Sequence, residues 1–344
     1  MGSALATPLA ARGQEVRLWG TWLDDHLLDA IEAGSPHPRT SVPVPDGVRL
    51  YRSDALTEAL DGSDVVILAV ASVGVDAVVR LAAPHMGHVR LLGVTSKGFL
   101  EDSSGKVRLL PESITGIFES LGLPAPIVVA AGGPCKANEV ALGRPTATVY
   151  GSDDIEAARS LARDIETDDY RIETIDDIIG LEVAAPLKNV YAIALGFADG
   201  LERATGEPWH NLKSAIFAQA LREMALVATT LGGRAETVFG LAGVGDLEVT
   251  GLSGRNKVYG ARIGSGETAA DALNAMILAE QTVEGVPAAT LAVTLAASLL
   301  PEAGTTLPLL FAIGSIIEGG SDPLEQLTHA VLPATVDATK RVIV

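Results

Sequence analysis

The sequence predicts an α/β fold followed by an all-α domain, and two patterns along its 344 residues carry that prediction. In the first half, β-branched runs such as "DVVILAV" (64–70) alternate with helical patterns such as "IEAARSLARDI" (155–165). This alternation is typical of a mostly parallel sheet covered by helices. From about residue 180 the strand signals stop, and segments with helical periodicity follow one another between glycine-rich loops. We therefore predict two domains, residues 1–179 and 180–344.

The other strands of the predicted sheet are apolar runs at regular intervals. They are "EVRLWG" (15–20), "VRLLGVTSKGF" (89–99), "APIVVAAGGP" (125–134), "TATVYGS" (146–152) and "YRIETIDD" (170–177). Residues 3–12 carry apolar residues at helical spacing, so a helix is expected to feed the strand at 15–20. A helix followed by a buried strand is the second half of a dinucleotide-binding βαβ unit. The first strand and the glycine turn of that unit are not in the printed sequence, and we expect them to lie upstream of Met1.

Composition and charge argue against several classes of function. The hydrophobic fraction of 48% is that of a globular chain with a large core rather than a disordered one. The net charge of −18 argues against broad contact with the phosphate backbone of a nucleic acid. An anionic small substrate would therefore need a local cluster of lysine and arginine side chains.

The single cysteine, Cys135, allows no disulfide framework within the chain, so a reducing compartment is expected. The apolar runs at 288–300 and 307–317 are too short to cross a bilayer, and the chain does not open with a signal-peptide pattern. We expect a cytoplasmic protein with no membrane insertion. The six histidines show no metal-ligand spacing, so no metal is predicted.

Three predicted strands end in small or polar residues that could approach a ligand. The segments are "AVAS" (69–72), "TSKGF" (95–99) and "GGPCKANE" (132–139). Ligands of open α/β sheets bind outside the carboxyl ends of the strands. Ordinary strand-to-helix turns have the same composition, so each segment taken alone is better interpreted as a turn that binds no ligand.

Lys188 stands out in the helical half because nearly every neighbour in "EVAAPLKNVYAIALG" is apolar. A lysine in such a helix usually extends its ammonium group to the surface, and spacing alone favours that interpretation. Burial would instead lower its pKa from about 10.4 toward neutrality. A lysine with such a pKa can transfer a proton at physiological pH.

A second polar group lies in "LAGVGDLEVTGLSGRNKVYGARIGSGE" (241–267), where Asp246, Thr250, Arg255 and Asn256 stand among seven glycines. Glycine lets the backbone approach a ligand closely, and arginine presents a planar fork to a phosphate dianion. Residues 253–256 are expected just ahead of a helix, whose free amides could add to an anion site. The alternative is a flexible surface loop with routine charges.

Taken together, these motifs resemble the NAD(P)-dependent glycerol-3-phosphate dehydrogenase family. The matching segments are "VTSKGF", "GGPCKANEVALGRPT", "APLKNVYAIALGFADGL", "NLKSAIFAQALREM", "GLAGVGDLEVT", "SGRNKVYG" and "EQTVEGV", in the family's order from Gly2 to about Val286. The resemblance implies a Rossmann-like N-terminal domain and a helical C-terminal domain. It also implies a homodimer that exchanges hydride between dihydroxyacetone phosphate and a nicotinamide, in glycerophospholipid and carbohydrate metabolism.

The resemblance further implies a role for each matching residue. Lys188 matches the general acid/base, with Lys97 and Asp246 beside it as the other catalytic residues. Substrate contacts are expected from Lys97, Gly133, Lys188, Asn189, Asp246, Thr250, Arg255 and Asn256. Cofactor contacts are expected from Gly2, Ser72, Lys97, Ala137, Arg255 and Glu284.

Several departures from the family pattern leave alternatives open. Gly2 matches the third glycine of G-x-G-x-x-G, so the Rossmann-like domain apparently lacks its first strand, and a non-catalytic homologue with impaired cofactor binding is one alternative. The short segment between Asp246 and Arg255 leaves open a dehydrogenase of another small polyol phosphate. Pro186 is expected in the first turn of the Lys188 helix. Cys135 is expected to be a structural replacement rather than a nucleophile.

The cofactor expected from the resemblance is NAD or NADP. After the strand at 15–20 comes "GTWLD", which contains no arginine to bind the 2′-phosphate of NADP. This segment favours NAD.

Overall fold

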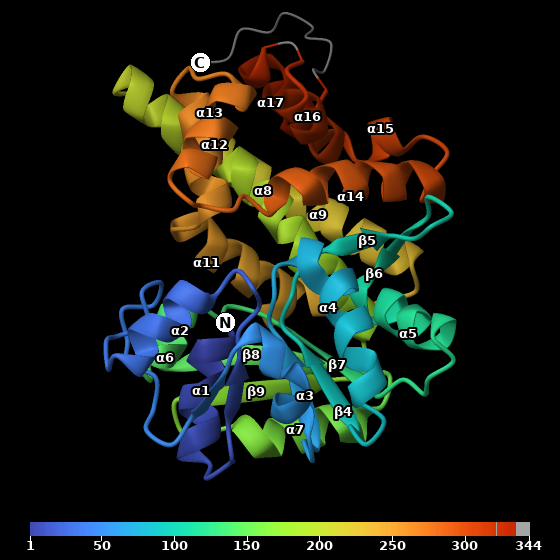
Figure 1. Cartoon of the computed structure of the whole chain (residues 1–344). Helices are drawn as coiled ribbons and strands as arrows, with labels where there is room; N and C mark the ends of the chain where they lie inside the picture. The colour runs from blue at the N-terminus through green and yellow to red at the C-terminus, as the bar shows by residue number, and fades with distance from the viewer. Residues whose placement is uncertain (321, 335–344) are drawn as a thin grey trace, which may run out of the picture.

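The structure, a computed structural model, describes residues 1–320 and 322–334, and it confirms the predicted order of an α/β part followed by a helical part. Figure 1 shows the sheet in the lower half and the helices stacked above it. The main sheet runs in the order β3 (Val65–Leu68), β4 (Leu91–Val94), β7 (Ile127–Gly132), β8 (Thr146–Gly151) and β9 (Tyr170–Ile175). Only β7 and β8 pair antiparallel, so the sheet is mostly parallel as predicted.

A second, parallel pair consists of β1 (Arg17–Trp19) and β2 (Arg49–Tyr51), and it is not hydrogen-bonded to the main sheet. The first helix, α1 (Gly2–Ala11), comes directly before β1. The helical turns and helices of this half are α2 (Asp25–Glu32), η1 (Ser53–Ala55), α3 (Leu56–Leu60), η2 (Ser72–Gly74), α4 (Val75–Ala82), η3 (Ala83–His85), α5 (Leu110–Ser120), α6 (Ala137–Ala141) and α7 (Ile155–Ile165).

Helices cover both faces of the main sheet, and each face has its own apolar core. On one face, Val79 of α4 and Ile114 and Phe118 of α5 are buried. On the other face, Leu5 of α1 and Leu161 of α7 are buried. Burial on both faces explains why the strands are continuous apolar runs in the sequence.

The run at 89–99 forms two strands rather than one. After β4 the chain leaves the sheet, and the antiparallel hairpin of β5 (Phe99–Glu101) and β6 (Val107–Leu109) packs against the helical part. Phe99 and Val107 are buried in the same core as Val183 of the helical half. The loop that carries Lys97 is therefore anchored to the sheet at one end and to the helices at the other.

The centre of the helical part is α8 (Ile178–Thr205), of which the middle is buried on every side. Asp177 caps its first turn by accepting a hydrogen bond from the Gly180 amide at 2.9 Å. By length and composition, this helix could cross a membrane. The sequence analysis considered only the shorter apolar runs at 288–300 and 307–317 and did not identify it. However, 94% of its apolar stretch is buried inside the structure, as expected of a core helix.

Pro186 lies in the interior of α8, so its predicted place in the first turn is wrong. The helix begins eight residues earlier, because the apolar pattern continues through "IIGLEVAA" and Asp177 supplies the cap. The domain boundary at 179/180 falls within the first turn of this helix and stays a prediction.

The remaining helices surround α8. They are α9 (His210–Thr230), α10 (Ala235–Phe239), the π-helical turn η4 (Leu241–Gly245), α11 (Asp246–Leu252), α12 (Arg255–Gly264), α13 (Ala269–Leu278), α14 (Gly285–Leu299), α15 (Ala303–Thr306), α16 (Pro308–Ile317) and α17 (Pro323–Val331). The buried carboxylate of Glu223 on α9 ties that helix to α8 and α16. It accepts hydrogen bonds from the Tyr191 hydroxyl and from the amides of Leu309 and Leu310.

Glycines allow α12 to cross α8 in direct backbone contact. A methyl group at Gly196 of α8 would overlap the carbonyl oxygen of Lys257, and one at Gly260 of α12 would overlap that of Ile193. Gly200 and Gly264 make the matching close approach one turn further on. This crossing fixes the start of α12 beside Lys188.

Replacing Gly260 with alanine is expected to destabilise the protein by about 2 kcal/mol or more, because the backbone at the crossing must shift to admit a methyl group. Thermal unfolding measures the effect. Gly116→Ala is the matched control: Gly116 is exposed in the interior of α5 and faces open space. Since alanine favours a helix by up to about 1 kcal/mol over glycine, the control should unfold at the same temperature or higher. Equal losses in the two variants would contradict the role given to the crossing.

Candidate active site

Lys188 is buried in the third turn of α8, with 8% of the residue exposed. Its Nζ donates hydrogen bonds to Oδ1 of Asp246 at 2.5 Å and to Oγ1 of Thr250 at 2.9 Å. Both acceptors are on α11, which packs across α8 at this point. The interpretation that Lys188 reaches the surface is therefore wrong, because polar partners are available inside.

Lys97 reaches the same carboxylate from the loop between β4 and β5. Its Nζ lies 2.6 Å from Oδ2 of Asp246, so each oxygen of that carboxylate binds one ammonium group. Asp246 is 1% exposed and is the first residue of α11, directly after the π-helical turn. Two cations share one anion, and the cluster keeps one net positive charge when all three groups are ionised.

The two lysines titrate differently. Burial lowers the pKa of Lys188 to about 8, with the nearby charge of Lys97 acting in the same direction and Asp246 opposing it. Burial also acts against the charge of Lys97, but Asp246 outweighs it and raises the pKa of Lys97. Lys97 is thus a permanent cation, and Lys188 is a group that can gain or lose a proton near neutral pH.

A network of amides lies next to this cluster. Nδ2 of Asn256 donates to Oδ1 of Asn189 at 2.9 Å, and the Gly285 amide donates to Oδ1 of Asn256 at 2.8 Å. Asn189 also contacts the carboxylate of Glu284 at 3.5 Å. The network joins α8, α12 and the start of α14. It brings together Asn189, Asn256 and Glu284, which lie far apart in the sequence and were each predicted as site residues.

Arg255 is exposed at the first position of α12, beside Asn256. Arg255 and Asn256 thus belong to the first turn of the helix rather than to a loop ahead of it. Among the described residues, no carboxylate lies within 4 Å of the Arg255 guanidinium. An unpaired guanidinium at a helix start is suited to an anion such as a phosphate.

The loop after β7 brings Gly133, Cys135 and Ala137 toward the same region. Gly133 has a φ of 88°, and a Cβ there would lie 3.3 Å from the Val149 amide nitrogen, so glycine is required. Burial raises the pKa of the Cys135 thiol, which lies 3.7 Å from the Tyr170 hydroxyl. A thiol in that state fits the structural role predicted for Cys135.

Of the residues predicted to hold a cofactor, Ser72, Lys97 and Ala137 follow the carboxyl ends of β3, β4 and β7, whereas Arg255 and Glu284 stand at the starts of α12 and α14. Gly2 begins α1, and a Cβ there would lie 3.3 Å from the Ala69 Cβ at the end of β3. Ser72 is buried and packs so closely on Gly98 that a side chain at Gly98 would overlap it. The first turn of α1 has no acidic side chain and no side-chain cap, so its amides are suited to a pyrophosphate. These residues fit a dinucleotide.

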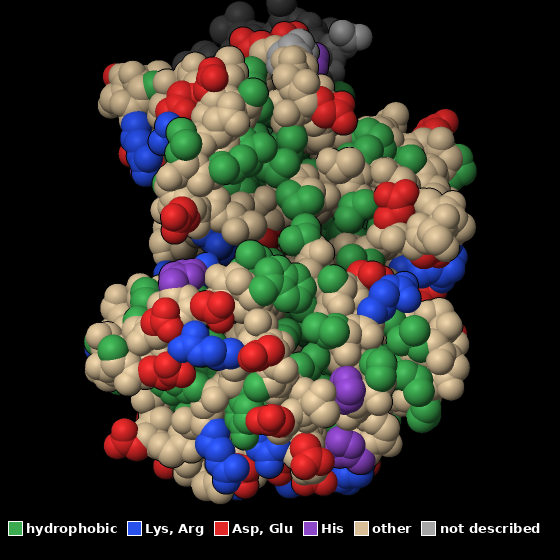
Figure 2. All heavy atoms as spheres, in the orientation of Figure 1, with side chains coloured by type: hydrophobic (Ala, Val, Ile, Leu, Met, Phe, Trp, Pro, Cys, Tyr) green, Lys and Arg blue, Asp and Glu red, His purple; other side chains and the backbone are tan. Residues whose placement is uncertain are grey.

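Sequence reasoning missed two basic residues near the site. Nζ of Lys136 donates to Oγ of Ser253 at 2.6 Å, joining the loop after β7 to the segment before Arg255. Arg39 is close enough to the Met1 amino group to influence its pKa, as Arg255 is. Lys136 lies in the segment 132–139, whose composition taken alone favoured an ordinary turn, and no pattern in the sequence singled out Arg39. Figure 2 shows Lys or Arg side chains at the waist between the two halves on the left of the view.

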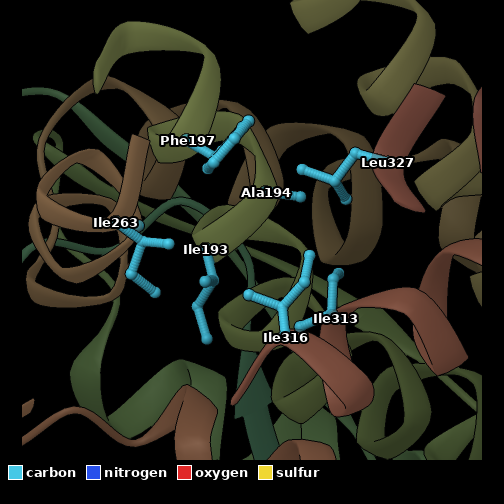
Figure 3. A pocket seen from close by; sticks show the side chains of 8 residues that line it. Ile193, Ala194, Phe197, Ile263, Ile313, Ile316 and Leu327 are labelled. Atoms are coloured by element: carbon cyan, nitrogen blue, oxygen red, sulfur yellow. The ribbon is translucent and has the colours of Figure 1, made fainter. Parts of the chain in front are cut away.

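The small cavity in Figure 3 lies elsewhere, among α8, α12, α16 and α17. Its lining is Ile193, Ala194, Phe197, Gly260, Ile263, Ile313, Ile316 and Leu327. Such a lining offers no polar side chain to a phosphate ester. No group of three or more potential metal ligands occurs among residues 1–320 and 322–334.

Comparison with known proteins places this geometry in a family. The family described as NAD-dependent glycerol-3-phosphate dehydrogenase matches with its N-terminal part at residues 1–158 and its C-terminal part at residues 177–328. The NADP(+)-dependent glycerol-3-phosphate dehydrogenase of Archaeoglobus fulgidus is 37% identical over 266 residues, which cover 77% of this chain and 78% of the relative. The chain belongs to the glycerol-3-phosphate dehydrogenase family.

Two further members of the glycerol-3-phosphate dehydrogenase family cover nearly the whole chain. The glycerol-3-phosphate dehydrogenase [NAD(P)+] of Koribacter versatilis is 32% identical over 347 residues, covering 98% of this chain and 96% of the relative. The crystal structure of the Coxiella burnetii enzyme superposes with a TM-score of 0.81 at 29% identity, covering 95% of this chain and 94% of that one. The resemblance inferred from the motifs is confirmed.

In this family member, Asp246→Asn is expected to shift the alkaline loss of ketone reduction to lower pH. Since the carboxylate raises the pKa of Lys188, removing its charge lowers that pKa further, and Lys188 loses its proton sooner. Leaving two buried lysines without a counter-charge should also cost about 3 kcal/mol of stability. The pH dependence of kcat and thermal unfolding measure the two effects.

Glu248→Gln is the matched control, because Glu248 is exposed on the same helix. It should leave both the pH profile and the unfolding temperature unchanged. An Asp246→Asn enzyme with the wild-type pH profile would show that Asp246 does not control the charge of Lys188.

Proposed function

We propose that this protein reversibly reduces dihydroxyacetone phosphate to sn-glycerol 3-phosphate with a nicotinamide cofactor. The observation that carries the proposal is the buried cluster in which Asp246 holds Lys97 and Lys188 together. The family relationship supports the same reaction. A bound nicotinamide supplies the hydride, and the protein must supply the proton and bind the phosphate.

Lys188 is proposed as the proton donor to the carbonyl oxygen of the substrate. Hydride addition converts a ketone into an alkoxide, and a positioned ammonium group supplies both positive charge and a proton. Asp246 and Thr250 fix the Lys188 ammonium by two hydrogen bonds. In the oxidation direction, neutral Lys188 takes the hydroxyl proton, and a pKa of about 8 allows both states near neutral pH.

The phosphate of the substrate is proposed to bind at the start of α12. Arg255 and the free amides of that helix supply the positive end, with Asn189 and Asn256 beside them. Lys97 adds a permanent charge at the other end of the substrate. Together they form the local cationic cluster that an anionic substrate needs in a chain of net charge −18.

Three finer proposals accompany the reaction. NAD is proposed as the preferred cofactor, since the segment after β1 contains Asp24 and no arginine; kcat/KM with NADH and NADPH tests this. A homodimer and a cytoplasmic location are proposed from the family resemblance, and light scattering tests the assembly.

A domain boundary at 179/180 is proposed because strand signals in the sequence stop there and only helical patterns follow. The start of α8 lies near this position.

Lys188→Ala is expected to lower kcat for reduction of dihydroxyacetone phosphate by about 10²- to 10⁴-fold, because the proton donor is lost. The oxidation of NADH is followed by its absorbance, and NADH binding should persist. Lys213→Ala is the control, since Lys213 pairs with Asp199 in the helical part away from the cluster. Full activity in Lys188→Ala would overturn the assignment. Turnover of other small polyol phosphates, compared in the same assay, tests the alternative substrate.

A further inference from the structure

Glu182 is a buried carboxyl that the reaction described above does not use. It lies on α8, six residues before Lys188, with 1% of the residue exposed. Neither carboxyl oxygen has a hydrogen-bond partner among the described residues. Buried polar groups are nearly always paired, and an unpaired carboxylate in a protein interior is costly. The position therefore needs a physical explanation.

Pro186 removes one main-chain hydrogen bond at the same turn of the helix. The carbonyl of Glu182 would normally accept a hydrogen bond from the amide four residues later, and that residue is Pro186, which has no N–H. Both the side chain and the main chain of Glu182 thus lack their usual partners. This polar turn stands in an otherwise apolar stretch of α8, directly before the catalytic lysine.

Lys97 is the charged group that acts on the Glu182 carboxyl. Its ammonium favours ionisation, but burial has the larger effect and raises the pKa of Glu182 to about 8. Further titratable groups near α8 include its cap Asp177 and, on elements packed against it, Asp246 of α11, Arg222 and Glu223 of α9, Glu236 of α10, Lys257 of α12, Arg108 of β6 and Tyr150 of β8. Arg108 and Asp177 are engaged elsewhere, with Asp102 and with the amide of Gly180.

We propose that Glu182 is a positioning residue whose neutral carboxyl leaves the Lys97–Asp246–Lys188 cluster with its net positive charge for a phosphorylated substrate. When Glu182 ionises, the charges of the cluster and of the carboxyl sum to zero, and the site attracts the anionic substrate less strongly. The ionised state thus weakens substrate binding without changing the proton donor. The proposal rests on the proposed function.

Glu182→Gln tests this, because glutamine keeps the size of the side chain and cannot ionise. The KM for dihydroxyacetone phosphate is measured from about pH 6.5 to 9.5 with saturating NADH. In the wild type both Lys188 and Glu182 lose a proton as the pH rises, so KM should climb more steeply than it would with Lys188 alone. In Glu182→Gln only Lys188 does so, and KM should be about tenfold lower than wild type at the alkaline end. At neutral pH, kcat should be unchanged.

Glu223→Gln is the matched control. Glu223 is also a buried glutamate, but it is hydrogen-bonded to Tyr191 and to two main-chain amides. Its replacement is expected to lower the unfolding temperature and to leave the pH dependence of KM at the wild-type slope. A folded Glu182→Gln enzyme with the wild-type slope would overturn the proposal.

A direct measurement covers the case in which Glu182→Gln fails to fold. In the Glu223→Gln background, infrared difference spectra with ¹³C-labelled glutamate should show a protonated carboxyl at pH 6.5 that disappears by about pH 9.5. Its absence at pH 6.5 would also overturn the proposal. If the wild type does not reduce dihydroxyacetone phosphate at all, the proposed function fails, and the infrared result still decides the state of Glu182.

Discussion

The structure depends on one carboxylate shared between two ammonium groups. Asp246 is almost fully buried and binds Lys188 through one oxygen and Lys97 through the other. Neither lysine could be kept ionised at this depth without a counter-charge, because desolvation of an unpaired ammonium is too costly. The same carboxylate links a loop of the sheet to two helices, so the electrostatic requirement of the site also joins the two halves of the molecule.

The helices supply the precision that this arrangement needs. The close contact of α8 with α12, made possible by Gly196 and Gly260, places Asn256 against Asn189. Asn189 follows Lys188 directly, so the start of α12, proposed to bind phosphate, and the proposed proton donor are held by a single helix crossing. The hydrogen bond from the Gly285 amide to Oδ1 of Asn256 then fixes the start of α14 against α12. The close packing of the α8 and α12 backbones thus determines where the polar side chains of the site lie.

Most of the fold could be predicted from the sequence, because its signals are local. The helix at 155–165 and the strands at 146–152 and 170–177 follow from apolar periodicity, which needs no knowledge of the partners. The burial of Lys188 could not be predicted that way: spacing favoured the surface, and only Asp246 and Thr250, about 60 residues later, make burial possible. Lys136 and Glu182 were missed for the same reason. The sequence does not show that Lys136 contacts Ser253, or that the buried carboxyl of Glu182 has no hydrogen-bond partner among the described residues. Pro186 was misplaced because a proline is usually a boundary signal.

The β5–β6 hairpin has a mechanical consequence for Lys97. The lysine is encoded within the sheet-forming half, yet Phe99, two residues later, is locked into the core of the helical half. On the other side of Lys97, the Thr95 amide and the Ser96 hydroxyl donate hydrogen bonds to the main-chain carbonyls of Leu68 and Val70, at 2.9 and 2.7 Å. The segment is therefore tethered to the sheet before the lysine and to the helices after it. Lys97 is held like a bead on a short taut bridge, and its ammonium position depends on how the two halves are placed.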